Sequence, residues 1–295
     1  MRWRTDLAKE ACETLDEQAG IKRETWTSSG VPGERVSILT ERAERESGKK
    51  KGRYTVFESD ALQRREKESF EPLSRAIAEE IRLFLGGTEK RDTVLVAGLG
   101  NAHMTADSIG PRTVNRVLVT RHLFRYMPEV TDDRMHSVCA LAPGVLGVTG
   151  IESADVLAGL CRRADVRALI VVDALAARRR ERMFSTFQVS DAGIEPGAGV
   201  GNKRSALTKD SLGIPVIALG VPTVIYASSL VYDAVSCGLS EKEAERMAEE
   251  TETDLVVTPK EIDVIADDCA CVLADAINLA LHAPMSLQEI HQWLE

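Results

Sequence analysis

Hydrophobic residues follow two different patterns along this chain of 295 residues. From residue 93 onwards, short segments of strand length recur, and uninterrupted apolar runs of this kind are typical of strands covered on both faces. The apolar runs are residues 93–98, 169–172 and 215–220, and residues 137–141 and 184–189 are further strand candidates. Stretches with helical spacing separate several of them, at roughly 108–121, 152–163, 223–236 and 259–281. This alternation predicts an α/β fold, with a mostly parallel sheet and helices on both faces.

The helical patterns in the first 90 residues are less regular. Residues 72–85 predict an amphipathic helix, with Ile81 and Leu83 turned inward and Glu80 turned outward. Residues 5–18 also place apolar side chains on one helical face and predict a second helix. These elements precede the alternating part of the chain, so we expect them to pack around it.

Two further segments before residue 90 predict strands, at 35–40 and 54–57. The intervening residues 41–53 include three consecutive lysines, and a charge run between two strands is usually a solvated hairpin loop rather than a phosphate-binding site. We therefore expect one α/β domain over residues 7–295, with a small accessory β element near 31–58. No long linker or internal repeat divides the chain.

Composition restricts the partners of the protein. The formal net charge is −9, which argues against a nucleic-acid ligand because phosphate binding requires a basic face. No uncharged apolar run reaches the length of about 18 residues that a membrane span requires. The start of the chain lacks the apolar stretch of a secretory signal, so the expected location is cytoplasmic.

Two aspartates are the main candidates for chemistry. The predicted strand that ends at Gly98 continues into a loop containing Asp107, and the predicted strand 169–172 ends directly at Asp173. In an open α/β sheet, catalytic groups gather beyond the carboxyl ends of the strands. Both acids should therefore lie on one rim of the sheet, and they converge if the two strands are neighbours.

Each aspartate also has a structural explanation. Asp107 precedes a predicted helix and can cap its N-terminus. Asp173 directly follows an apolar strand, where a carboxylate can hold a neighbouring loop through hydrogen bonds. The case for catalysis therefore depends on the two residues together.

Two glycine-rich loops follow predicted strands, at residues 142–152 and 193–204. Neither has the ending of a phosphate-binding loop, and glycine at such a rim suits the close approach of an extended peptide. The candidate substrate-binding residues in these loops are Gly144, Gly197, Gly199, Gly201 and Asn202.

Other catalytic schemes find little support in the chain. It has no Gly-x-Ser-x-Gly elbow, no His-Glu-x-x-His motif and no cysteine with an evident histidine partner. His103 lies in the same loop as Asp107, where a metal-ligand role and a surface role are both open. We expect no metal ion and no cofactor.

Several ordered motifs resemble the spore germination protease family of endospore-forming bacteria, whose fold is related to that of hydrogenase maturation proteases. The motifs are residues 98–101 and 107–111, 142–145 and 149–152, 173–178, 196–202 and 213–223. The resemblance covers most of the chain and implies an atypical aspartic endopeptidase with Asp107 and Asp173 as its two acids. It also implies synthesis as a zymogen, a homotetramer and a location in the forespore or spore core. The implied substrates are small acid-soluble spore proteins, cut during germination after an acidic and before a hydrophobic residue.

The N-terminus is similar to the cleavage sites of that family. Residues 5–10 have the expected acidic–hydrophobic pair at Asp6 and Leu7, which implies self-processing between them and a propeptide of residues 1–6. A nickel-dependent endopeptidase of the hydrogenase maturation type is the alternative, because that family places acids at the two equivalent positions. Such proteins are much shorter than this chain.

Overall fold

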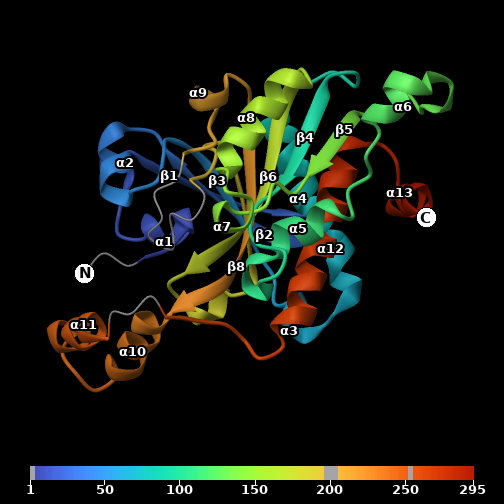
Figure 1. Ribbon diagram of the computed structural model, residues 1–295. Helices are drawn as coiled ribbons and strands as arrows, with labels where there is room; N and C mark the ends of the chain where they lie inside the picture. Colours follow the sequence, from blue (N-terminus) through green and yellow to red (C-terminus); the bar gives the residue numbers. More distant parts are fainter. Residues whose placement is uncertain (1–3, 196–204, 252–254) are drawn as a thin grey trace.

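The computed structural model describes residues 4–195, 205–251 and 255–295. Within these ranges the chain forms one nine-stranded sheet with helices on both faces (Figure 1). The strands are β1 (Ile21–Ser28), β2 (Val31–Ile38), β3 (Gly52–Glu58), β4 (Thr93–Gly98), β5 (Ser137–Leu141), β6 (Val166–Ala177), β7 (Thr186–Ser190), β8 (Val216–Tyr226) and β9 (Val256–Val257). They follow the order β1-β2-β3-β7-β8-β6-β4-β5, and β9 pairs with β8. The predicted α/β fold is confirmed.

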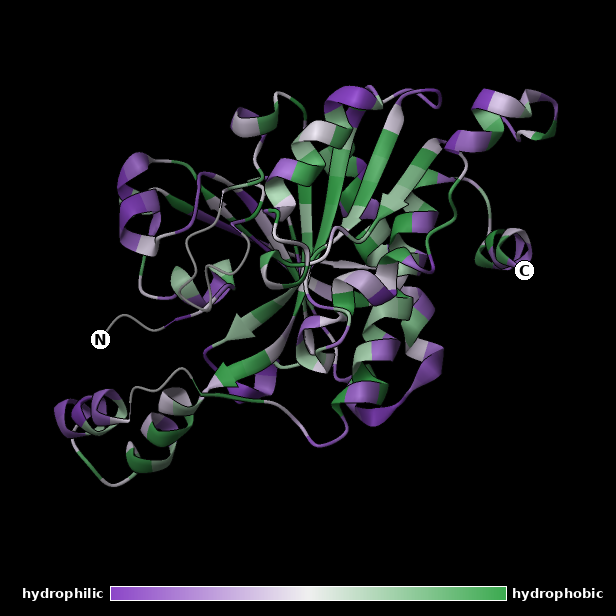
Figure 2. Ribbon diagram, viewed as in Figure 1, coloured by the Kyte–Doolittle hydropathy of each residue, from purple (hydrophilic) through white to green (hydrophobic). Residues whose placement is uncertain are grey.

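The central strands β5, β4, β6 and β8 run parallel to one another. Their apolar side chains alternate between two core clusters, with Val96 and Ile170 on one face and Leu95 and Leu169 on the other. This double burial explains the uninterrupted apolar runs. Helices α4 (Phe70–Leu85), α5 (Ile109–Val114) and α12 (Ile262–Leu281) pack on the first face, and α8 (Ser153–Arg163) covers the second. Figure 2 shows the hydrophobic centre of the sheet between these helices.

Helix α4 follows the predicted amphipathic pattern with two exceptions. Ile81 is buried as expected, but Leu83 is 51% exposed. Glu80, expected to face solvent, is buried, and its carboxylate pairs with the Arg35 guanidinium at 2.8 Å. The accessory strands cover this side of α4, since Thr55 of β3 also donates a hydrogen bond to Glu80. The prediction for these two residues was wrong because the pattern of α4 does not reveal what packs beside it.

The accessory β element is larger than predicted and belongs to the main sheet. Strands β1, β2 and β3 form an antiparallel meander, and β3 joins the parallel core through β7, which is antiparallel to both β3 and β8. The expected loop at 41–53 contains helix α2 (Glu41–Ser47), which Thr40 caps by accepting a hydrogen bond from the Ala43 N–H. The expected helix at 5–18 is shorter, because only α1 (Ala8–Ala11) and the 3-10 turn η1 (Glu17–Ala19) form there.

Two central strands extend further than their apolar runs indicated. Strand β6 continues through Asp173 to Ala177, and β8 continues to Tyr226, so the helix expected at 223–236 begins only at α10 (Ala227–Val235). The two strands remain paired over this extension, with an irregularity in register between Leu175 and Ala176. Asp173 therefore lies within a strand, not at its end. It is nevertheless beyond the end of β4, whose last residue, Gly98, pairs with Val172.

The remaining helices are short and peripheral. The helix expected at 108–121 ends at Val114, and a separate helix, α6, begins at Arg121. The other helices are α3 (Ala61–Arg64), α6 (Arg121–Tyr126), α7 (Leu146–Thr149), α9 (Lys209–Leu212), α11 (Glu241–Glu250) and α13 (Leu287–Leu294). No helix in the described part of the chain combines the length and the apolar character needed to cross a membrane.

Candidate active site

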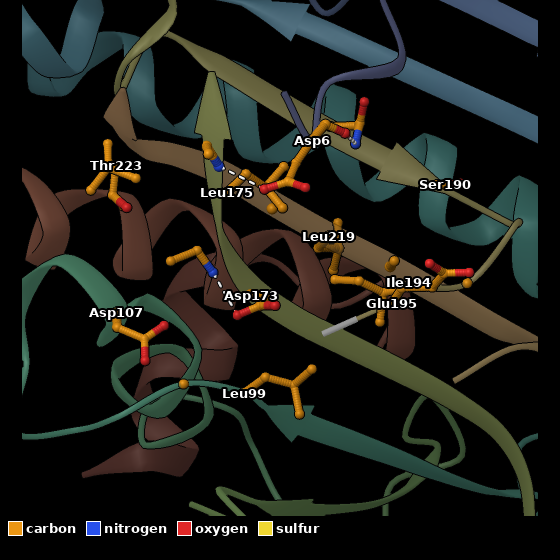
Figure 3. A pocket seen from close by; sticks show the side chains of 18 of the residues that line it. Asp6, Leu99, Asp107, Asp173, Leu175, Ser190, Ile194, Glu195, Leu219 and Thr223 are labelled. Carbon is orange, nitrogen blue, oxygen red and sulfur yellow. Dashed lines mark hydrogen bonds between the residues drawn. The ribbon is translucent and has the colours of Figure 1, made fainter. Parts of the chain in front are cut away.

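A cavity of about 380 Å³ lies where the parallel core meets the accessory strands. Its lining includes Asp107 and Asp173 from the parallel core, Lys49 from the loop after α2, and Gln188 from β7. Asp6 of the N-terminal segment also lines it. Figure 3 shows Asp107, Asp173 and Asp6 around this cavity, each from a different part of the chain. The structure therefore brings both predicted acids and the predicted cleavage site to one place.

Asp173 lies in β6, directly beyond the predicted end of this strand, and is only 7% exposed. Its carboxylate accepts a hydrogen bond of 2.9 Å from the Ala174 N–H. Across the sheet, Asp173 is in register with Gly220 of β8, which in turn is in register with Gln188 of β7. Residues that pair in register share a face of the sheet, and the glycine between them has no side chain. The Leu175 side chain occupies the space over Gly220, since a Cβ atom there would lie 2.6 Å from it.

Asp107 ends a single 3-10 turn, η3 (Thr105–Asp107), in the loop beyond β4. Its carboxylate accepts a hydrogen bond of 2.8 Å from the Asn101 N–H, which closes this loop on itself. Ser108, rather than Asp107, occupies the N-cap position of α5. The β4 and β6 strands are direct neighbours, as the sequence prediction required for the two acids to converge.

The tight path of this loop depends on Gly100. Gly100 has φ +103°, a conformation that residues with a side chain rarely adopt. A Cβ atom there would lie 2.0 Å from the Asp107 carbonyl oxygen. The glycine therefore allows the backbone at Asp107 to pass against the end of β4.

The N-terminal segment lies against the wall of the cavity and bends at Asp6, shortly before helix α1 begins. The Asp6 N–H donates to the Ala176 carbonyl oxygen at 2.8 Å, and the Ala176 N–H donates to the Asp6 carboxylate at 2.8 Å. Gln188 bridges the next peptide units, because its amide nitrogen donates to the Asp6 carbonyl oxygen at 3.3 Å and its amide oxygen accepts from the Ala8 N–H at 2.8 Å. Hydrogen bonds with Gln188 thus hold the Asp6–Leu7 peptide group and the peptide group that follows it.

Side chains on either side of this bond anchor the segment. Leu7 is fully buried in an apolar cluster with Leu175, Ala177 and Ile225. Glu10 is also buried, and its carboxylate accepts hydrogen bonds from two backbone N–H groups directly after β6, at 2.8 and 3.1 Å. Burial of a leucine side chain contributes about 2 kcal/mol, so these residues fix the segment to the domain.

Two residues of the cavity wall were not predicted from the sequence. Lys49 was assigned to a solvated loop, but its ammonium nitrogen lies 3.8 Å from the Asp6 carboxylate and only 18% of its side chain is exposed. Gln188 was assigned to a strand and given no role. The lysine run in an acidic chain was the available signal for Lys49, whereas Gln188 has no sequence signal because its partners are distant in sequence.

The other predicted site residues are placed less centrally or lie outside the described residues. Gly144 has φ +78°, and its carbonyl oxygen accepts a hydrogen bond of 2.8 Å from Ser153, a residue that lines the cavity. His103 is exposed, and its N–H donates to the Asn101 side chain. Within the described ranges, no three His, Cys, Asp or Glu side chains gather closely enough to hold a metal ion. Four candidates lie outside the described residues: Gly197, Gly199, Gly201 and Asn202.

Comparison with known proteins assigns the family. The family described as "Germination protease" matches this chain over residues 4–253. The chain belongs to the germination protease family. As a germination protease, it is a peptidase of spore germination, in agreement with the resemblance found in the sequence.

Curated germination proteases match almost the full length of the chain. That of Caldanaerobacter subterraneus subsp. tengcongensis is 39% identical over 99% of this chain and 98% of its own length. Those of Halalkalibacterium halodurans and Clostridium acetobutylicum are 38% and 34% identical, over 95% and 99% of this chain. They are aligned over 93% and 98% of their own lengths.

A solved structure also aligns with this germination protease. It is a [NiFe] hydrogenase maturation protease, HycI, from Thermococcus kodakarensis KOD1, with a TM-score of 0.37 and 16% identity over 67% of this chain and 98% of the other. An alignment this distant supports no conclusion about activity. The family match therefore favours a germination protease over the nickel-dependent alternative.

Proposed function

We propose that this germination protease is an aspartic endopeptidase in which Asp107 and Asp173 act together on a water molecule. The observation that carries the proposal is the shared cavity: both acids line it, and so does Asp6, the acidic member of the predicted pair. Its neighbour Leu7 is buried against Leu175, which also lines the cavity. A peptide of the sequence expected in substrates is thus docked beside two carboxylates.

In the proposed mechanism, the two carboxylates share one proton, because two like charges held close together do not both ionise readily. The ionised carboxylate takes a proton from water as the water oxygen attacks the carbonyl carbon of the scissile peptide. The protonated carboxyl group donates its proton to the leaving nitrogen as the carbon–nitrogen bond breaks. In this mechanism either aspartate can act as the acid and the other as the base, because the shared proton belongs to the pair.

We further propose that the first cut is in the protein itself, between Asp6 and Leu7, and removes residues 1–6. In the docked position, Asp6 pairs with Ala176, which is three residues beyond Asp173 on β6, or about 10 Å along a strand. The segment therefore has to shift toward the acids before it is cut. This requirement suits synthesis as a zymogen, in which the docked segment occupies the cavity until processing.

The wider proposal follows the family. We propose that the substrates are small acid-soluble spore proteins, cut after an acidic and before a hydrophobic residue in the spore core. We also propose a homotetramer as the working assembly. The docked Asp6–Leu7 pair supports the sequence preference, since it is the type of pair that such substrates would present.

Mass spectrometry of the purified protein tests the mechanism. We expect the unaltered protein to lose residues 1–6 over time, and the Asp107→Asn and Asp173→Asn variants to keep them. Processing between Asp6 and Leu7 that persists in both variants would overturn the two-aspartate mechanism. A parallel incubation with a metal chelator separates the nickel-dependent alternative, because chelation should leave processing by two carboxylates unchanged.

A further inference from the structure

The cavity presents an electrostatic problem for the substrates proposed above. It is lined by Asp107 and Asp173, and Glu195 adds a third carboxylate. An acidic side chain that enters a partly buried site with other carboxylates is repelled unless a cation compensates. A protease that cuts after an acidic residue therefore needs a cationic group in this cavity.

Two cations, Lys49 and Lys50, line the cavity among the residues that the structure describes. Lys50 pairs with carboxylates of the protein, at 3.2 Å from Glu44 and 4.0 Å from Glu195, and 52% of its side chain is exposed. Lys49 faces the docked peptide instead, with its ammonium nitrogen 3.8 Å from the Asp6 carboxylate. Both partners of this second pair are about four-fifths buried, at 18% and 17% exposure. Lys49 is thus the cation directed at an acidic side chain of the bound segment.

The backbone around Lys49 is held in place by local contacts. Helix α2 ends at Gly48, whose φ of +71° turns the chain toward the cavity. The Lys49 N–H donates to the Ser47 hydroxyl oxygen at 3.2 Å. The Tyr54 hydroxyl donates to the Lys50 carbonyl oxygen at 2.8 Å, and burial raises the pKa of Tyr54, which keeps this donor protonated. The loop therefore presents Lys49 from a fixed position.

We propose that Lys49 is the residue that selects the acidic side chain before the cut, and that in the docked position it shares this carboxylate with the Ala176 N–H, which the peptide leaves as it shifts toward the acids. This inference rests on the proposed function. The ammonium group supplies charge and the N–H supplies direction, since the Asp6 carboxylate already accepts a hydrogen bond of 2.8 Å from Ala176. A lysine has a long flexible side chain, so Lys49 follows the carboxylate as the peptide moves toward Asp107 and Asp173.

The test compares two peptides that copy residues 2–11 and differ only in Asp or Asn at the position of Asp6. The measured quantity is the ratio of their kcat/KM values. In Lys49→Met we expect this Asp/Asn ratio to fall about tenfold, because an ion pair and its charge compensation are lost. Lys49→Arg should restore most of the preference. Lys51→Met is the matched control, because Lys51 belongs to the same lysine run, its side chain is 48% exposed and its ammonium nitrogen lies 4.0 Å from Glu41.

An unchanged Asp/Asn ratio in Lys49→Met, or an equal fall in Lys51→Met, would overturn the assignment of Lys49. A second readout does not require catalysis. In full-length protein that carries Asp173→Asn, hydrogen–deuterium exchange of the Asp6 amide reports docking of the segment. Adding Lys49→Met should speed this exchange about tenfold, whereas adding Lys51→Met should not. Faster exchange in the Lys49→Met protein, together with no peptide cleavage by the protein that keeps Asp173, would refute the proposed function and leave the subsite standing. Unchanged exchange would refute the subsite.

Discussion

The parallel and antiparallel halves of the sheet meet at the β7–β8 pair, and they contribute different groups to the cavity between them. The parallel half provides Asp107 and Asp173, whose carboxylates accept hydrogen bonds from nearby backbone N–H groups. The antiparallel half provides Lys49 and Gln188, which reach the docked N-terminal segment through long side chains. The comparison suggests that the parallel half performs the chemistry and holds the peptide backbone at Ala176, whereas the antiparallel half adds the side chains that recognise the peptide. Substitutions can test this division because they should affect one property without the other.

The largest effect should come from the acids. Asp107→Asn and Asp173→Asn each remove one carboxylate without a large change in volume, so we expect kcat for peptide cleavage to fall by about a thousandfold or more. Docking of the N-terminal segment should be unaffected, which amide exchange at Asp6 can measure. Cleavage at a tenth of the normal rate in either variant would contradict a catalytic role for that residue.

The parallel half was largely predictable because its strands have a local signature. Runs such as 94–98 contain no polar side chain, and such runs indicate strands that are buried on both faces of the sheet. The acids were found by the same reasoning, since β4 and β6 are neighbours and the loop after β4 therefore lies beside the continuation of β6 that holds Asp173. The apolar pattern did not predict that β6 continues beyond Asp173. This continuation depends on pairing with β8, which is a contact between distant segments of the chain.

The antiparallel half was harder to predict because its structure depends on tertiary contacts. Strand β1 has a mostly exposed pattern, and the buried Glu80 is compensated by Arg35 from a separate element. The docking of Asp6 depends on Ala176 and Gln188, which lie about 170 and 182 residues away along the chain. No local pattern can encode such pairs, so a candidate cleavage site could be predicted from residues 5–10 but its place in the fold could not.

A strong effect is also expected at Gly100. Gly100→Ala would place a Cβ atom 2.0 Å from the Asp107 carbonyl oxygen, at a φ of +103°. We expect the free energy of unfolding to fall by about 3 kcal/mol, with loss of cleavage because the loop that holds Asp107 must move. Thermal unfolding and kcat measure the two effects. Gly147→Ala is the matched control, because a Cβ atom there meets no atom within 4 Å. If Gly147→Ala lowered stability and cleavage as much as Gly100→Ala, a clash at Gly100 would not explain the effect.

The Glu10→Gln substitution should have an effect of intermediate size, because it should weaken docking of the N-terminal segment without loosening the parallel core. Glu10 holds the N-terminal segment, with a side chain that is 1% exposed and lies 3.1 Å from the Arg182 guanidinium. Glu10→Gln should destabilise the docked segment by about 2 kcal/mol, because a buried charged partner of backbone N–H groups is lost. Amide exchange near residues 6–10 should increase while exchange in β4 and β6 stays slow. Glu13→Gln, a change at a 49% exposed neighbour that pairs with Arg179, should have little effect.

The smallest effect concerns two histidines on the parallel half, away from the cavity. Burial lowers the pKa of both His136 and His282 to about 4, and the nearby Lys90 contributes to each shift. Within the described residues, the Nδ1 atoms of both rings are buried without a hydrogen-bond partner. Between pH 6.5 and 4 the unfolded chain therefore binds more protons than the folded one, so stability is lost as the pH falls.

From pH 7.5 to 5.5 we expect each histidine to cost about 1 kcal/mol of unfolding free energy, measured by denaturant titration at several pH values. His282→Gln should reduce this pH dependence by about half, since its side chain can still donate to the Leu118 carbonyl oxygen that His282 Nε2 contacts at 3.2 Å. His103→Gln, at an exposed position, should leave the slope unchanged. Neither buried histidine lines the cavity. As the pH falls, the free energy of global unfolding should therefore decrease before amide exchange at Asp6 becomes faster. The reverse order would mean that the antiparallel half, and not the parallel core, is the acid-sensitive part of the molecule.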